Sequence, residues 1–346
     1  MDLRTNIDLK QLRYFVAVVD AGSISRASKL HHIAQPALSK RIGQLEYDLG
    51  APLLHRGHTG VQPTEQGWML YRAAQRVLRD MASVVEAVHA AESDPVGDVR
   101  IGCLQSLTAL VGAPLAVRVI EEFPRVRLSV LGGQSLEIYR ALVDGLLDVA
   151  LCVWDEEAPH LEVELQIQEE FFLAASPDMP GLPKEAVIDP KRLKRFPFVF
   201  PTARTYASGP VIVGQLQEMG IELNVIAEID GDGIKSLIAG GHGCCILTLS
   251  TIQSEVAAGR IVLKRLRNTP IWRTLALCTA KDRPLSLAAR AVTQQMKKVI
   301  EDQIRTGAWR NVQIAAGRPN LSTDGIPVSP TGITPASATM GQARRD

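Results

Sequence analysis

The residues whose types and spacing best suit contact chemistry lie in one short stretch, HHIAQPALSKRIGQLE at residues 31–46. Proline suits the first turn of a helix because its missing N–H has no partner to lose there, so Pro36 predicts that a helix begins beside it. At about 100° per residue, one side of this helix is an apolar stripe of Leu38, Ile42, Leu45 and Leu49. The opposite side carries Pro36, Lys40, Gly43 and Tyr47, with Ser39 and Gln44 on its flanks.

This small polar face matches the chemistry of reading bases in a DNA groove. Gln and Ser exchange hydrogen bonds with base edges, and Lys binds guanine or a phosphate. Gly43 costs about 1 kcal/mol relative to alanine inside a helix. Close approach to another surface would explain that glycine, and so would tolerance on an exposed face. From these residues alone, a DNA-reading helix and an ordinary surface helix both stay open.

The elements around this helix predict a small domain that positions it. Apolar residues at helical spacing predict a first helix over 9–21, and Ser23 or Ser25 can cap a short second one. Residues 51–67 have the glycine and proline content of a hairpin wing, in which Arg56 is placed to meet a phosphate. A wing beside the polar helix favours DNA binding over an ordinary surface helix.

A long helix is predicted after Thr64, which can cap it. Its apolar residues alternate spacings of four and three: Leu70, Ala74, Val77, Met81, Val84, Val88 and Ala91. This spacing pattern favours a coiled coil and therefore a dimer. A dimer would present two reading helices to a two-fold DNA site. The alternative is an amphipathic helix packed on its own domain.

Composition narrows the class of protein. A chain of 346 residues is long enough for two or three domains, and its formal net charge is only +1. Residues 1–65 hold eight Lys and Arg against six Asp and Glu, a difference of +2 that is compatible with DNA. There is no CxxC pair among the five cysteines, no signal peptide and no apolar run of about 18 residues. We expect a cytoplasmic protein with reduced thiols and no membrane contact.

The N-terminal sequence resembles the LysR-type transcriptional regulators. The resemblance rests on LRYFVAVVDAGSISRASKLHHIAQPALSKRIGQLE, on Arg56 and on PTEQG at 63–67. HIAQPALS, FFLAASPDMPG at 171–181 and IAEIDG at 226–231 are similar to the nitrogen-assimilation-control subgroup. The resemblance implies DNA contacts at Gln35, Pro36, Ser39, Lys40 and Arg56, to which the helical wheel adds Gln44. Ala34 departs from the Ser of many members and cannot cap the reading helix.

From residue 97 onward, strand-like and helix-like segments alternate, which indicates parallel sheets with helices on both faces. Ligands bind such sheets at the carboxyl ends of the strands, so the loops after residues 103, 132, 200 and 229 are expected to form one cleft. The resemblance implies a periplasmic-binding-protein-like α/β sensor of two subdomains. The first would comprise 97–166 and 269–305, and the second 167–268.

Four residues are candidates for contact with an effector. Ser106 and Ser135 fall where family members commonly place Ser or Thr against an effector, and Thr202 and Arg204 lie on a facing loop. Arg204 would favour an anionic effector. The same residues also suit ordinary loop and cap roles, with Ser135 as a helix N-cap. The subgroup leaves open whether any small molecule is used.

The sequence lacks the signatures of catalysis. It has no GxSxG, no HExxH and no phosphate loop, so we expect no enzyme activity and no cofactor. His31 and His32 are neighbours that do not share a helix face, so no metal site is expected from them. Cys103 ends the first sensor strand and carries a second hypothesis, redox sensing. A stand-alone solute-binding or catalytic α/β protein is the rival interpretation.

The predicted fold is therefore an all-α winged helix-turn-helix followed by an α/β sensor. Its parts are a DNA-binding domain at 1–63, a dimerisation helix at 64–95, an effector-binding domain at 97–305 and a tail at 306–346. The tail is rich in Gly, Pro, Ser, Thr and Ala and is expected to be disordered. The resemblance implies a homodimer or homotetramer that binds double-stranded promoter DNA, a small-molecule effector and RNA polymerase.

Overall fold

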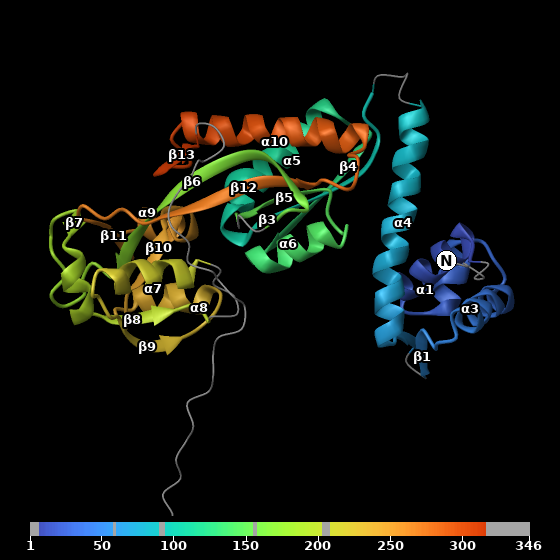
Figure 1. Cartoon of the computed structure of the whole chain (residues 1–346), viewed down its shortest axis with the longest axis horizontal. Helices are drawn as coiled ribbons and strands as arrows, with labels where there is room; N and C mark the ends of the chain where they lie inside the picture. Colours follow the sequence, from blue (N-terminus) through green and yellow to red (C-terminus); the bar gives the residue numbers. More distant parts are fainter. Residues whose placement is uncertain (1–6, 58–59, 90–93, 155–157, 203–207, 316–346) are drawn as a thin grey trace, which may run out of the picture. The chain divides into compact units, whose positions relative to one another are not determined.

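The computed structural model describes residues 7–57, 60–89, 94–154, 158–202 and 208–315 (Figure 1). The N-terminal part contains α1 (Leu9–Ala21), α2 (Ile24–Leu30), α3 (Gln35–Leu49), β1 (Leu54–Gly57), β2 (Gly60–Pro63) and α4 (Glu65–His89). These are the three short helices, the wing and the long helix that the sequence predicts.

Two of the three short helices begin at a side-chain cap. The Asp8 carboxylate accepts the N–H of Gln11 at 2.6 Å while the Gln11 side chain accepts the N–H of Asp8 at 2.9 Å, which satisfies two free donors of α1. The Ser23 hydroxyl accepts the N–H of Arg26 and begins α2. At α3, Ala34 stands at the N-cap and provides no side-chain hydrogen bond, as predicted.

The apolar stripe of α3 packs into the core of this domain. Leu38, Ile42 and Leu45 are fully buried against side chains of α1 and α2. Leu49, predicted in the same stripe, is instead 36% exposed. It is the last residue of α3, next to the left-handed Gly50 that ends the helix, and it lies outside the buried cluster. The stripe still determines which face of α3 remains outside.

The wing packs closely against the end of α1. Gly60 has a φ of +129°, and a Cβ on it would lie 2.4 Å from the carbonyl oxygen of Gly22. Val61 donates its N–H to the same oxygen at 3.0 Å. Only glycine allows this backbone conformation and this close approach, so Gly60 fixes the hairpin beside the helices.

The apolar stripe of α4 is divided between two environments. Leu70 packs against the DNA-binding core and Ala74 is buried. Val77, Met81 and Val84, further along the helix, are 38%, 43% and 55% exposed. The start of α4 is therefore covered by its own domain, while the stripe is open from Val77 to Val84. The side chain of Val88 and the last predicted position, Ala91, lie outside the described part of the chain.

The sensor contains two sheets that share one long strand, nine strands in all, and a separate two-stranded sheet. The first sheet has the order β4 (Val126–Gly133), β3 (Gly97–Leu104), β5 (Val149–Val153), β12 (Trp272–Ala280) and β6 (Leu161–Ala175), with β13 (Val312–Ile314) also on β6. The end of β6 continues into the second sheet, which contains β10 (Cys245–Thr248), β11 (Val262–Leu266) and β7 (Val187–Ile188). Strand β8 (Pro197–Phe200) pairs with β9 (Asn224–Glu228) and bridges to Cys244 beside β10.

Helices cover both faces of the first sheet, as predicted. Figure 1 shows α5 (Ala113–Glu122) and α10 (Leu287–Arg305) on one face and α6 (Ser135–Val143) on the other. The remaining helical segments are η1 (Gln105–Leu107), η2 (Thr108–Gly112), η3 (Pro190–Arg195), α7 (Gly209–Glu218), α8 (Asp232–Ala239), η4 (Leu249–Thr251) and α9 (Gln253–Ala257). No helix among the described residues is long and apolar enough to cross a membrane.

The sheets are mixed rather than wholly parallel, which corrects the prediction. Strand β3 is parallel to β4 and β5, but β12 is antiparallel to both β5 and β6. The reason is that the chain leaves the first sheet along β6 and returns to it along β12 after the second subdomain, so the two neighbouring strands run in opposite directions. Strand β6 pairs with β12 as far as Glu170 and with β10 from Phe171. Its passage between sheets thus falls after Glu170, beyond the predicted subdomain boundary at 166/167.

The expected disorder from residue 306 is wrong for residues 306–315. Trp309 is 2% exposed, and β13 pairs with β6. One tryptophan and a three-residue strand are too short to give a recognisable apolar pattern in the sequence. They are ordered by contacts with β6, which is remote along the chain. Residues 316–346 lie outside the described part of the chain.

Candidate nucleic-acid interface and effector site

The predicted reading face of α3 is accessible. Gln35, Pro36, Lys40 and Gln44 are exposed, and Ser39 is half-buried. A Cβ added to Gly43 would meet no described atom within 4 Å, so this glycine leaves open space beside the polar side chains. The Gln44 amide donates to Asp48 at 2.7 Å, which orients that side chain along the helix. This surface can present donors and one cation to a partner.

The wing arginine lies directly beside the reading helix. One terminal nitrogen of Arg56 donates to the Ser39 hydroxyl at 3.4 Å, and the other pairs with the Glu46 carboxylate at 3.1 Å. Arg56 and Ser39 therefore form one contact unit, although they come from different elements. Sequence reasoning missed Glu46, which lies seven residues after Ser39 and so on the same side of α3, two turns along the helix.

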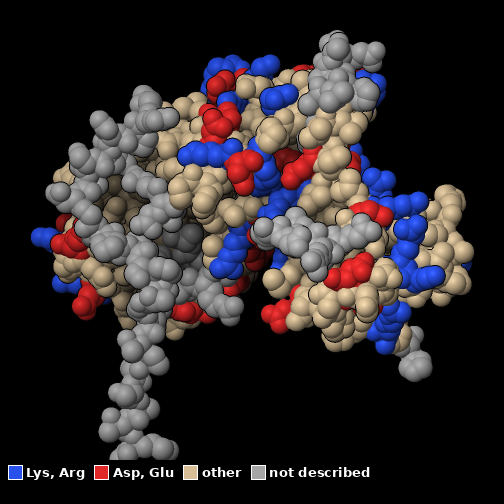
Figure 2. All heavy atoms as spheres, turned by 45° about the vertical axis from the view of Figure 1, so that its right-hand side comes forward, with Lys and Arg blue, Asp and Glu red and all other residues tan. Residues whose placement is uncertain are grey.

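Charged side chains of both signs are mixed on the surface (Figure 2), which agrees with the small net charge of residues 1–65. Figure 2 shows Lys and Arg interspersed with Asp and Glu on the face in view. Two cations of the DNA-binding domain, Lys10 and Arg41, lie 5.9 Å and 5.8 Å from the ring centre of Tyr14. Such contacts hold cationic groups against the protein surface. Contacts of Lys40 and Arg56 with DNA stay predictions.

A hydrogen bond connects α4 to the helix-turn-helix. The Tyr71 hydroxyl donates to the Asp20 carboxylate, and the Gln75 amide donates to the Tyr71 oxygen. Burial of the ring and the bond to Asp20 raise the pKa of Tyr71 to about 12. The phenol thus stays neutral at ordinary pH and holds the start of α4 against α1.

The predicted cleft loops meet in two pairs, one after β3 and β4 and the other after β8 and β9. Cys103 lies opposite Gly132 in the parallel β3–β4 pair, and a Cβ on Gly132 would lie 2.6 Å from the side-chain oxygen of Gln105. Ser106, half-buried, follows in η1. After β8 and β9, the N–H and hydroxyl of Thr202 donate to the Asp230 carboxylate at 2.9 and 2.8 Å. A single cleft between the two pairs stays a prediction.

Ser135, a candidate effector residue, is engaged within the protein. Ser135 is not the N-cap of α6, because Gln134 occupies that position. The Ser135 oxygen instead accepts the N–H of Val153 at 3.0 Å, which joins the start of α6 to the end of β5. Its hydroxyl can still donate to another group. Arg204 lies outside the described residues.

The surroundings of Cys103, the candidate for redox sensing, disfavour its reactive form. Burial raises the pKa of the Cys103 thiol, and the nearby Thr108 hydroxyl only partly offsets that effect. Burial also raises the pKa of Cys244 to about 12. A raised pKa disfavours the thiolate, which is the reactive form. Among the described residues, no group of three or more His, Cys, Asp or Glu is placed to hold a metal ion.

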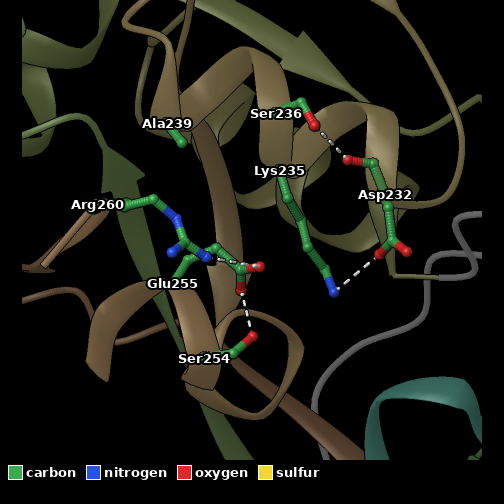
Figure 3. A pocket seen from close by; sticks show the side chains of 7 residues that line it. All are labelled: Asp232, Lys235, Ser236, Ala239, Ser254, Glu255 and Arg260. Carbon is green, nitrogen blue, oxygen red and sulfur yellow. Dashed lines mark hydrogen bonds and ion pairs between the residues drawn. The ribbon is translucent and has the colours of Figure 1, made fainter. Parts of the chain in front are cut away.

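A hollow of about 460 Å³ in the second subdomain is lined by none of the described candidate effector residues (Figure 3). It is lined by Asp232, Lys235, Ser236, Ala239, Ser254, Glu255 and Arg260. Its charged groups largely pair with one another: Lys235 contacts Asp232 at 3.0 Å, and Arg260 contacts Glu255 at 3.8 Å. The paired charges leave little net attraction for an ionic ligand.

A helix-turn-helix with an exposed polar reading face, followed by a two-sheet α/β domain, defines a DNA-binding transcriptional regulator. Residues 9–68 match the family described as "Bacterial regulatory helix-turn-helix protein, lysR family", and residues 92–301 match "LysR substrate binding domain". The chain belongs to the LysR family of bacterial DNA-binding transcriptional regulators, which confirms the resemblance inferred from the sequence.

Several characterised proteins are similar over most of the chain. The "Nitrogen assimilation regulatory protein nac" of Escherichia coli K12 is 28% identical, over 86% of this chain and 97% of its own length. The "HTH-type transcriptional regulator CbbR" of Xanthobacter flavus is 26% identical, over 95% and 96%. The first similarity supports the resemblance to the nitrogen-assimilation-control subgroup.

Solved structures of the same fold include two full-length regulators. A full-length OxyR variant from Pseudomonas aeruginosa matches with a TM-score of 0.66 and 20% identity, over 91% of this chain and 99% of its own. CbnR complexed with its target DNA matches with a TM-score of 0.61 and 21% identity, over 85% and 100%. These matches establish the winged helix-turn-helix and the two-subdomain, periplasmic-binding-protein-like sensor.

Proposed function

We propose that this chain reads pseudo-palindromic promoter DNA with α3 and the wing, as a homodimer or homotetramer in the cytoplasm. The observation that carries the proposal is the contact of Arg56 with Ser39, which joins a phosphate-binding group to a base-reading face. Gln35, Pro36, Lys40 and Gln44 complete that face, since all four are exposed on α3. Phosphate contacts would fix the register while the α3 side chains read the sequence.

Self-association is supported by the open part of the α4 stripe. Val77, Met81 and Val84 recur at coiled-coil spacing and are exposed in the single chain. Pairing of two α4 helices would bury them and bring two reading helices to one site. The domain limits proposed from the sequence, 1–63, 64–95 and 97–305, then separate reading, pairing and sensing.

The sensor is proposed to bind a small molecule, with Ser106, Ser135, Thr202 and Arg204 as contacts and an anionic effector favoured by Arg204. Its closure would change the angle between dimers, and with it the bend of the DNA and the contact with RNA polymerase. The protein would act by binding alone, with no enzymatic step. Support for this regulatory role comes from the relatives, which are transcriptional regulators.

The first test is a gel-shift titration with the DNA upstream of the protein's own gene, a scrambled competitor and moderate salt. A retarded band that survives the competitor is the expected result, because specific contacts exceed phosphate attraction. Equal loss of the band with specific and scrambled competitor, repeated on fragments covering the genome, would contradict sequence-specific reading.

A further inference from the structure

An acidic residue stands within the proposed DNA-binding unit. Glu46 lies on α3, two turns after Ser39, and its side chain is 19% exposed. DNA binding depends on neutralising phosphates, so a carboxylate near the duplex lowers affinity if charge alone matters. Charge alone therefore predicts that removal of the Glu46 carboxylate strengthens binding.

Both oxygens of Glu46 are used by the wing. One oxygen accepts the backbone N–H groups of Leu53 and Leu54, at 2.9 and 3.2 Å, where the chain enters β1. The other oxygen pairs with the Arg56 guanidinium at 3.1 Å. A single carboxylate from α3 thus holds the backbone at the start of the wing and also the cation that the wing presents.

Part of the Arg56 guanidinium stays exposed to solvent despite these contacts. Its side chain is 45% exposed, with one terminal nitrogen on Glu46 and the other on Ser39. A guanidinium has five N–H donors in a rigid plane, so two contacts leave donors for a phosphate oxygen. The ion pair orders a long flexible side chain before DNA arrives, which lowers the entropy lost on binding.

We propose that Glu46 is a positioning residue for DNA recognition: it does not contact the duplex but holds Arg56 and the wing over the reading helix. The inference rests on the proposed function, because it requires Arg56 to contact DNA. It makes the opposite prediction from simple charge repulsion, since loss of the negative charge should weaken binding.

The experiment compares Glu46→Gln, Arg56→Met and the double variant in the full chain, by equilibrium binding to a specific site over a range of salt concentrations. Glutamine keeps an oxygen for the wing N–H groups but cannot form an ion pair with Arg56. We expect Glu46→Gln to weaken binding roughly tenfold and to lower the salt slope by about one, as loss of a phosphate contact would. The double variant should bind no more weakly than Arg56→Met alone.

Glu65→Gln provides the matched control. It removes the same charge from an exposed position at the start of α4. Its affinity should stay unchanged or rise slightly.

Different results would overturn this inference and the proposed function. Binding by Glu46→Gln that is as tight as that of the wild type, or tighter, with an unchanged salt slope overturns the positioning role. The positioning role also fails if adding Glu46→Gln to Arg56→Met weakens DNA binding as much as Glu46→Gln does alone. General destabilisation of the domain would give that result, because it acts independently of Arg56. If Arg56→Met itself changes neither affinity nor slope, the proposed DNA contact fails, and Glu46 cannot act through it.

Discussion

The carboxylate of Glu169 accepts a hydrogen bond from Nε of Arg273 at 2.9 Å, with the glutamate side chain fully buried and that of the arginine 9% exposed. The pair joins β6 to β12 just before β6 passes into the second sheet. Arg273 also reaches the hydroxyl of Thr248 at 3.3 Å, at the end of β10. One ion pair therefore connects both sheets of the sensor at their junction.

We predict that Arg273→Met destabilises the sensor by about 3–5 kcal/mol, because it leaves the Glu169 charge buried without its partner. Glu169→Gln combined with Arg273→Met should recover part of the loss, since no uncompensated charge remains. Urea denaturation followed by tryptophan fluorescence measures both variants. A loss below about 1 kcal/mol for Arg273→Met would mean that water replaces the arginine at this site.

The segment after α10 should contribute to the same junction. Trp309 is 2% exposed, and its indole N–H donates to Glu169 at 3.1 Å. Trp309→Ala is expected to cost about 3–5 kcal/mol, the range for truncation of a buried aromatic side chain. Arg310→Ala, at the exposed neighbouring position, should stay within about 0.5 kcal/mol of the wild type in the same denaturation experiment. Equal effects of the two substitutions would contradict a structural role for this segment.

The sequence predicted the parts of the fold that local patterns specify. The stripe of Leu38, Ile42 and Leu45 identified both α3 and its outer face, since helical periodicity needs no knowledge of the partner. The antiparallel β6–β12 pair and the packing of Trp309 depend on residues more than a hundred positions apart, which leave no such pattern. The long β6 was likewise missed.

Local sequence patterns likewise predict only part of the candidate site. The helical wheel placed the polar face of α3 without knowledge of the wing. The contact of Glu46 with Arg56 depends on how the wing folds back on α3, so spacing alone could not distinguish Glu46 from any other surface acid. Residue type alone leaves Ser135 open as an effector contact or a helix cap, whereas its position beside β5 gives it Val153 as partner.

Replacement of Ser39 and Lys40 by alanine tests the reading face directly. We expect the double variant to lose specific binding by at least about tenfold, since one base contact and one charged contact disappear. The dimer should persist, because both residues are remote from the exposed α4 stripe. Lys298→Ala removes one exposed cation from α10 and serves as the charge control. A double variant that binds its specific site like the wild type would refute this placement of the reading face.

The exposed α4 stripe predicts a specific loss of self-association. Met81→Glu with Val84→Glu would place two carboxylates in the proposed coiled-coil seam, at a cost of about 2 kcal/mol or more for each unpaired buried charge. Sedimentation velocity should show smaller assemblies, and DNA binding should weaken with them. Arg72→Glu adds an acid on the opposite side of α4, where it should leave assembly unchanged. An unaltered oligomer in the double variant would mean that another surface pairs the chains.

The bond between Tyr71 and Asp20 predicts the behaviour of this junction at alkaline pH. The pKa of Tyr71 is about 12 in the folded protein, raised first by burial and then by Asp20, against about 10 in an unfolded chain. The fold therefore favours the neutral phenol, and its stabilising effect is fully present below about pH 10 and is lost as the pH rises toward 12. Phenolate absorbance measured for the wild type and for Tyr71→Phe isolates this residue among the five tyrosines. The missing component should titrate near 12, and Asp20→Asn should move it toward 10 because the amide carries no charge. A component that already titrates near 10 in the wild type would show that α4 is not held to α1 through this bond.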